Sequence, residues 1–187
     1  MRSLEALVTA PLTDRTDRRG SGALRFESLT VRNASAGGSL VRSGDDVQII
    51  LRYASSSATL NDVHVDMVIH VALDEELAQL SSTAQRGTFT QLAGRGELVC
   101  TVPPLLLAAG PCRITVFSRV NGEIADWVVH AAVMNVEPGD SFGTGRGNNE
   151  EPWQFPSLTG GRHGDDRQPA AQCRAQRVPT WGISFPS

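Results

Sequence analysis

Three closely spaced glycines near the end of the last apolar segment are the first feature of this sequence that could do chemistry. Gly143, Gly145 and Gly147 lie in or just after the stretch NVEPGDSFGTGR, residues 135–146. A glycine loop holds phosphate when it leads into a helix whose free N–H groups point at the anion. Here the following segment, NNEEPWQFP, contains helix-breaking prolines, and the spacing G-x-G-x-G is not the dinucleotide fingerprint. All seventeen basic residues are arginine, so a Walker lysine is missing too, and the stretch does not predict a nucleotide site.

Other combinations of reactive side chains do not predict an enzyme. No serine lies in a G-x-S-x-G elbow, and the four histidines have no evident nucleophile partner. The carboxylate pairs Asp45–Asp46 and Glu75–Glu76 are adjacent in sequence, so on a strand they would point to opposite faces. Cys100, Cys112 and Cys173 lack the spacing of a metal site, and we interpret the first two as small buried residues. We therefore expect no catalytic residues, no cofactor and no metal.

The elements that must position any binding residues are strands. Apolar and polar residues alternate with period two in VQIILRY, VHVDMVIHV, GELVCTV, CRITVFSRV and AAVMNVE, which is typical of half-buried strands. In ALRFESLTV the phase changes, which predicts a β-bulge near Glu27 and Ser28. Turn residues separate the segments, including the Asn-Gly pair of a hairpin in VNGE. The pattern predicts an all-β fold, an antiparallel two-sheet β-sandwich of Ig-like or jelly-roll type.

The boundaries of this domain follow from composition. Residues 1–21 lack periodicity and are predicted to be a linker, residues 22–147 form the sandwich, and residues 148–187 are a proline-rich tail that we expect to be disordered. An aromatic of the tail that docks on the domain is the alternative. The segment LDEELAQL, residues 73–80, is predicted to be a short strand or a single helical turn.

Charge and hydropathy argue against several further classes of protein. A net charge of -3 lacks the basic excess of a nucleic-acid binder, so no nucleic-acid partner is expected. The longest apolar run, VPPLLLAAG, is much shorter than the roughly 20 residues of a membrane span. The first residues do not form a signal peptide, which leads us to expect a cytoplasmic location.

The order of these segments is similar to that of a known family. RRGSGALRFESLTVRN, SGDDVQIILRYAS and VPPLLLAAGPCRITVFSRVNGEIADWVVHAAVMNVEPGDSFGTGR together resemble the C-terminal domain of Wzt-type ATP-binding subunits of polysaccharide ABC exporters. The resemblance runs from about Gly20 to Arg146 and makes the glycine stretch an end-of-domain signature. The ATPase that precedes this domain in the family has no counterpart in this sequence, and the residues after Arg146 match nothing in the family pattern. Export activity is therefore not assigned to this chain alone.

The resemblance implies a β-sandwich that binds O-antigen or a similar polysaccharide for export, with ABC exporter subunits as partners. It also implies a homodimer in which the terminal strand, here Ala132 to Glu137, is exchanged between subunits. A cytoplasmic location follows from it as well, peripheral to the inner membrane through an exporter.

Outward positions of three strands could form the glycan site. Sugar rings stack on aromatic faces, and their hydroxyls pair with planar polar side chains. If segments 63–71, 112–119 and 130–136 share one sheet, their outward residues share its surface; Trp127 lies beside them, just after the hairpin. The candidate ligand-binding residues are His64, Asp66, His70, Arg113, Thr115, Phe117, Arg119, Trp127 and Asn135.

Five of these residues also have an interpretation without a glycan. Phe117 could pack on a neighbouring or exchanged chain, and Trp127 could close the end of the sandwich. The spacing of His64, Asp66 and His70 is only weak evidence for a metal site. The alternative is that these residues lie on a solvated face of the strand. The competing function is accordingly a structural or oligomerisation module that makes protein–protein contacts and binds no glycan.

Overall fold

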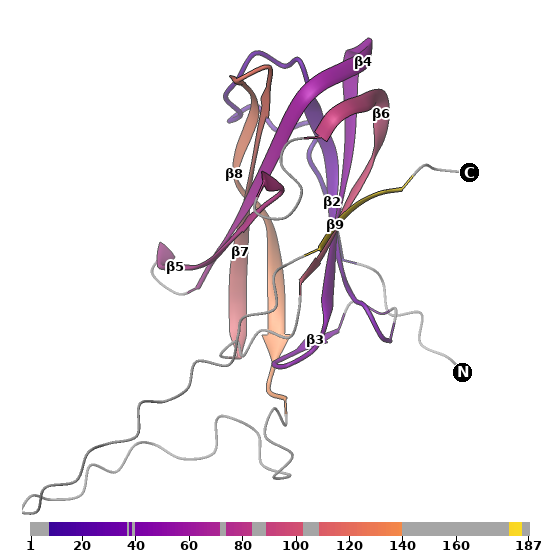
Figure 1. Cartoon of the computed structure of the whole chain (residues 1–187). Coiled ribbons are helices and arrows are strands. Elements are labelled where there is room, and N and C mark those ends of the chain that lie inside the picture. The colour runs from indigo at the N-terminus through magenta and orange to yellow at the C-terminus, as the bar shows by residue number, and fades with distance from the viewer. Residues whose placement is uncertain are drawn as a thin grey trace, which may run out of the picture.

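The structure is a computed structural model and is built from β-strands (Figure 1). It describes residues 8–36, 38, 40–71, 74–83, 89–102, 109–139 and 180–184. Every regular element in these ranges is a strand, and no helix there has the length and hydropathy of a membrane span. The strands are β1 (Val8–Pro11), β2 (Arg25–Asn33), β3 (Val41–Arg42), β4 (Val47–His70), β5 (Glu76–Ser81), β6 (Phe89–Val102), β7 (Gly110–Val120), β8 (Glu123–Glu137) and β9 (Thr180–Ser184).

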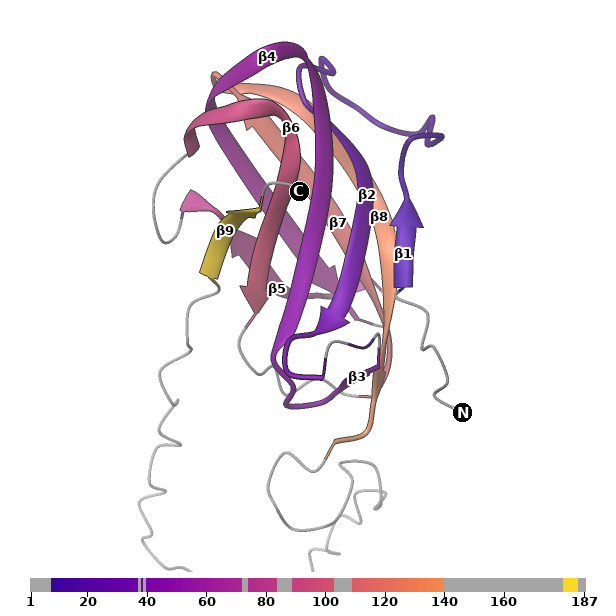
Figure 2. The same ribbon diagram turned by 90° about the vertical axis from the view of Figure 1, so that its right-hand side faces the viewer.

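Strand β4 belongs to both layers of the sandwich. Its first half pairs with β2 and β6, while its second half, from Val63 to His70, pairs with β7 and β5. The register with β6 shifts between Ala54 and Thr59, where the strand passes from one layer to the other. In Figure 2 the layer of β2, β6 and the first half of β4 lies in front of β7 and β8. All strand pairs are antiparallel except the short pair of β3 with β8. The predicted two-sheet sandwich is confirmed.

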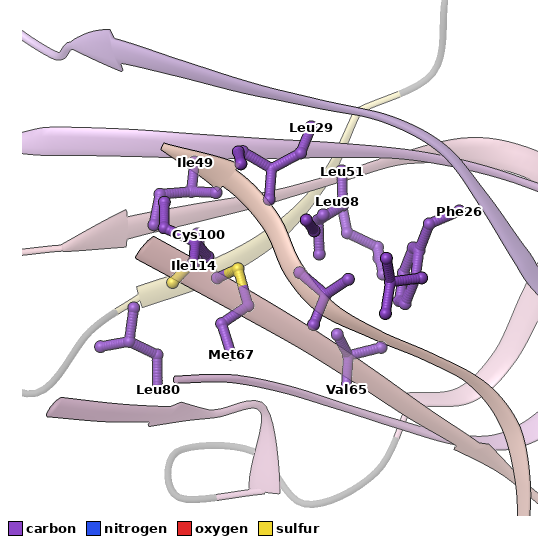
Figure 3. Packing of buried hydrophobic residues seen from close by; sticks show 14 of the residues in the cluster. Phe26, Leu29, Ile49, Leu51, Val65, Met67, Leu80, Leu98, Cys100 and Ile114 are labelled. Atoms are coloured by element: carbon purple, nitrogen blue, oxygen red, sulfur yellow. The ribbon is translucent and has the colours of Figure 1, made fainter. Parts of the chain in front are cut away.

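The core lies between the layers and is made of the inward residues of each alternating segment. Ile49, Leu51, Val65 and Met67 of β4 have no exposed surface, and they pack with residues of β2, β6 and β7 (Figure 3). Burying a side chain of this size stabilises the fold by about 1.5–3 kcal/mol. Burial also raises the pKa of Cys100 to about 12, so this thiol stays protonated at neutral pH and packs as a small apolar side chain.

Two local predictions are confirmed. The register of β2 with β4 shifts between Phe26 and Ser28, where the phase change predicted a bulge. The hairpin between β7 and β8 turns at Asn121 and Gly122, with φ of 51° and 83°. Positive φ at both central residues is the geometry that the Asn-Gly pair favours, because it matches the twist of the flanking strands.

The packed domain extends beyond the predicted boundaries of residues 22 and 147. β1 lies within the predicted linker and pairs with β2, and β9 lies within the predicted disordered tail and pairs with β6. Both additions pair with a strand edge that would otherwise present unpaired N–H and C=O groups. The segment expected as a short strand or helical turn, residues 73–80, overlaps β5, a short strand that ends at Ser81. The predictions for residues 1–7, 103–108, 140–179 and 185–187 lie outside the described residues.

Trp181 anchors β9, in agreement with the alternative of a docked aromatic. It lies opposite Cys100 in the register, is 3% exposed, and packs edge-to-face on Phe89 with ring centroids 6.4 Å apart. Its indole N–H has no hydrogen-bond partner among the described residues. The strand therefore docks through apolar burial and backbone pairing. Residues 132–137, the predicted exchanged element, pair within this chain with β7 and β3, and the exchange stays a prediction.

Truncating the anchor should loosen β9. We expect Trp181→Ala to lower the free energy of unfolding by about 3 kcal/mol, since a buried aromatic is lost and a cavity is left. The measurement is a urea unfolding curve. The matched control, Leu77→Ala, removes a side chain that is 44% exposed and should change stability by less than about 0.5 kcal/mol. Equal effects of the two variants would contradict the docking of β9.

Candidate functional site

The outer face of the second layer brings most of the predicted residues together. The second half of β4, β7 and β8 are neighbours in one sheet, as the expected strand order required. Cross-strand register places Asp66 opposite Phe117, and Phe117 opposite Trp127. His64 lies opposite Arg119, and His70 opposite Arg113.

An aromatic row with two arginines forms the centre of this face. Phe117 meets Trp127 edge-to-face with ring centroids 5.9 Å apart, and both residues are half-buried. The guanidinium of Arg119 lies 5.2 Å from the Phe117 ring centroid, and that of Arg19 lies 5.5 Å from the Trp127 ring centroid. Each such cation–π contact contributes an interaction free energy of about 0.5–1 kcal/mol at an exposed site. The Phe117 ring is therefore partly covered by Trp127 and Arg119 of its own chain. We call Arg119, Phe117, Trp127 and Arg19 the aromatic row.

A polar trio lies beside the aromatic row on β4 and β5. His64 Nε2 is 3.1 Å from Asp66 Oδ1 and 3.3 Å from Ser81 Oγ. Serine, histidine and aspartate together invite comparison with a catalytic triad, in which the carboxylate and the hydroxyl contact opposite ring nitrogens. Here both contacts converge on one nitrogen, so the ring cannot relay a proton from Ser81 towards Asp66. The trio instead presents hydroxyl, carboxylate and imidazole groups that can exchange hydrogen bonds with a ligand.

A second polar cluster gathers around Asp74, where the same sheet ends. Asp74 Oδ1 accepts a hydrogen bond from Arg113 Nη1 at 2.7 Å and lies 3.2 Å from His130 Nε2. The rings of His70 and His130 meet edge-to-face at 5.7 Å. His130, which the sequence prediction missed, has a φ of 49° and lies where the register of β7 and β8 shifts. No group of three metal-ligating side chains occurs in the described part of the chain, so the metal alternative gains no support.

Two predicted residues lie apart from the aromatic row. Thr115 is buried, and its hydroxyl accepts a hydrogen bond from the backbone N–H of His130 at 3.2 Å, so it offers a ligand little surface. The irregular register of β8 explains this, since it carries the backbone of His130 towards Thr115. Asn135 is exposed but pairs with Pro111, six residues from Phe117 along β7, or about 20 Å at 3.3 Å per residue.

A buried ion pair positions the segment that supplies Arg19. The Arg18 guanidinium contacts both carboxylate oxygens of Asp126, and their side chains are 6% and 3% exposed. Arg18 also donates to the carbonyls of Leu12 and Phe26, each at 2.9 Å, and Asp126 accepts from the Phe26 N–H at 2.9 Å. Every charge is thus met inside the protein, which is the condition under which a buried pair is tolerated.

The backbone next to this pair carries Arg19 to Trp127. Arg19 and Trp127 exchange two backbone hydrogen bonds, of 3.1 and 2.8 Å. Gly20 follows with a φ of 120°, and a Cβ there would lie 2.5 Å from the Ala125 carbonyl oxygen. Only glycine allows the segment to come this close to β8. Arg19 could not be found from the sequence because nothing in its aperiodic surroundings indicates a partner 108 residues away.

Comparisons with known proteins support the fold. No family model and no curated protein matches the sequence. Among solved structures, the chain is similar to one described as the crystal structure of the C-terminal domain of wzt, with a TM-score of 0.57 and 12% sequence identity. The similarity covers 76% of this chain and 90% of that one. At this identity the likeness shows a β-sandwich of the Wzt C-terminal kind and does not by itself identify a ligand.

Breaking the buried pair should destabilise the domain strongly. We expect Asp126→Ala to lower the free energy of unfolding by about 3–5 kcal/mol, because Arg18 would remain buried without a counter-charge. Adding Arg18→Met to this variant should recover part of the loss, since the uncompensated charge is removed. Chemical denaturation measures both effects.

The matched control for the pair is Arg52→Ala. This variant breaks the exposed Arg52–Glu97 pair, in which the arginine side chain is 53% exposed, and should cost less than about 1 kcal/mol. A cost for Asp126→Ala no larger than that of the control would contradict the role of the buried pair.

Proposed function

We propose that this chain is a non-catalytic carbohydrate-binding domain that recognises a bacterial surface polysaccharide of the O-antigen type for export by an ABC transporter. The observation that carries the proposal is the aromatic row on an open sheet face, with the polar trio beside it. The Phe117 and Trp127 rings are held in place by cross-strand pairing and keep part of their surface open to solvent. This combination suits a ligand with both apolar and hydroxyl-bearing faces.

The chemistry of a sugar matches these side chains. A pyranose presents C–H groups on one face, which pack on aromatic rings, and hydroxyls around its edge, which both donate and accept hydrogen bonds. Phe117 and Trp127 supply the rings. Arg119 supplies donors, while the Asp66 carboxylate accepts, and His64 can do either according to its tautomer. Because the face is a sheet surface and not an enclosed pocket, it suits an extended chain of sugars.

The exporter context rests on similarity. The sequence resemblance and the shared fold both point to the Wzt C-terminal domain, which supports a polysaccharide ligand, ABC exporter subunits as partners and a location at the cytoplasmic side of the inner membrane. A homodimer with residues 132–137 exchanged between subunits is part of the same proposal. In this arrangement the domain would select the glycan and other subunits would supply the energy for transport.

One observation favours the competing function of a structural or oligomerisation module. Val129 and Val133 of β8 are 42% and 45% exposed, although β-branched apolar residues on a strand usually gain from being covered. A protein partner could cover them. Val133 pairs with Arg113, six residues along β8 from Trp127, whereas Val129 is only two residues from Trp127. Val133 is therefore the residue at which the two functions predict different effects.

Substitutions in the aromatic row test the proposed function. We expect Phe117→Ala and Arg119→Ala each to weaken polysaccharide binding roughly tenfold or more, about 1.4 kcal/mol, because a stacking surface or its supporting cation is lost. Binding is measured by protein-detected NMR against O-polysaccharides released from bacterial lipopolysaccharides. Sedimentation of the same samples should show an unchanged oligomeric state.

Val133→Ala is the matched control on the neighbouring strand. Under the proposed function it leaves polysaccharide affinity unchanged. Should no polysaccharide perturb the resonances of the wild-type chain, while Phe117→Ala or Val133→Ala dissociates an oligomer, the structural module would replace the carbohydrate-binding domain.

A further inference from the structure

A pocket lined by arginines lies next to the aromatic row, between the N-terminal segment and the start of β8. Its volume is about 290 Å³. Arg19 lines it and also stacks on Trp127, so the pocket and the aromatic row share one side chain. The charged residues of its lining are Arg15, Arg18, Arg19, Arg25 and Asp126.

Two of these arginines are neutralised within the protein. Arg18 is paired with Asp126, as described above. Arg15 donates from Nε and Nη2 to the two carboxylate oxygens of Asp17, each at 2.6 Å, and also to the carbonyls of Val129 and His130. The hydrogen bond from Arg15 lowers the pKa of Asp17 to about 2, so this carboxylate stays ionised at neutral pH.

The other two arginines have no counter-charge. Arg19 and Arg25 are both exposed, and neither forms an ion pair with any carboxylate in the described ranges. The pocket therefore carries about two uncompensated positive charges, although the whole chain has a net charge of -3.

The backbone keeps the pocket open. Gly20 and Gly22 line it, with φ of 120° and 78°, and a Cβ on Gly22 would lie 3.0 Å from Arg25 Nε. Guanidinium groups bind carboxylate and phosphate oxygens through paired, charge-assisted hydrogen bonds. Two unpaired guanidinium groups at the border of a pocket of this size fit one such anionic group.

We propose that this pocket binds the carboxylate or phosphate group of an acidic glycan whose sugar ring lies on the aromatic row. The inference rests on the proposed function and narrows its ligand to an anionic polysaccharide. Arg19 links the two parts, because it lies over the face of Trp127 and lines the pocket at the same time. Binding of the charged group would fix where the polysaccharide lies along the sheet face. The rest of that face offers few contacts that would distinguish one position of the polysaccharide from the next.

The anion site can be tested apart from polysaccharide binding. The full chain is titrated with glucuronate, with inorganic phosphate and with neutral methyl glucoside, and NMR records the backbone amides and the arginine Nε–H signals. We expect both anions, and not the neutral sugar, to shift Gly20, Gly22, Arg19 and Arg25. Arg19→Gln and Arg25→Gln should each weaken anion binding at least fivefold, and added salt should weaken it in the wild type.

Two further variants sharpen the test. Asp17→Asn should strengthen anion binding severalfold, because it frees Arg15 for the ligand. Arg52→Gln removes an exposed arginine that is paired with Glu97 on the other layer, and it should have no effect. Phe117→Ala should keep glucuronate binding while it loses polysaccharide binding.

The possible results separate this inference from the proposed function. Polysaccharide binding with no response of the pocket residues to either anion would overturn the inference and leave the proposed function standing. Binding of glucuronate or phosphate at the pocket, with no polysaccharide bound by the wild type, would support the anion site and overturn the proposed function. An equal loss of anion binding in Arg52→Gln and Arg25→Gln would show diffuse attraction and overturn the site.

Discussion

The passage of β4 through both layers is the constraint on which the rest of the structure depends. One strand of 24 residues pairs with β2 and β6 over its first half and with β7 and β5 over its second. Because one backbone supplies a strand to each layer, the two layers cannot slide past each other without breaking its hydrogen bonds. The inward residues of both halves then meet in a single core (Figure 3).

The same pleat that builds the core positions the candidate site. Side chains alternate between faces along a strand, so burying Val65 and Met67 places His64 and Asp66 outside, and burying Val116 places Phe117 outside. A slip of one residue would move the whole set to the wrong face. The proposed carbohydrate face is thus held by the hydrophobic core directly beneath it, which lets it present aromatic rings without a flexible loop.

The N-terminal segment adds a positively charged side chain, Arg19, to that face. Its buried pair, Arg18 with Asp126, forms hydrogen bonds with three backbone groups, which belong to Leu12 and Phe26, and holds Arg19 against Trp127. The domain therefore has an aromatic row with an arginine at each end, and the pocket opens at the end of Arg19.

The sequence by itself determined the fold class, the inward and outward residues of the main strands, the bulge in β2 and the Asn121–Gly122 hairpin. These depend on period-two alternation and on local turn chemistry, which short segments contain in full. It also identified Phe117 and Arg119 as outward residues, because their positions follow from the same alternation, whereas Trp127 was named only from its place after the hairpin. The tertiary structure alone decided which strand edges β1 and β9 cover, that Thr115 is buried, and that Arg18 and Arg19 contact Asp126 and Trp127. Those contacts join segments about a hundred residues apart, and their energies depend on register and close approach, which no local pattern records.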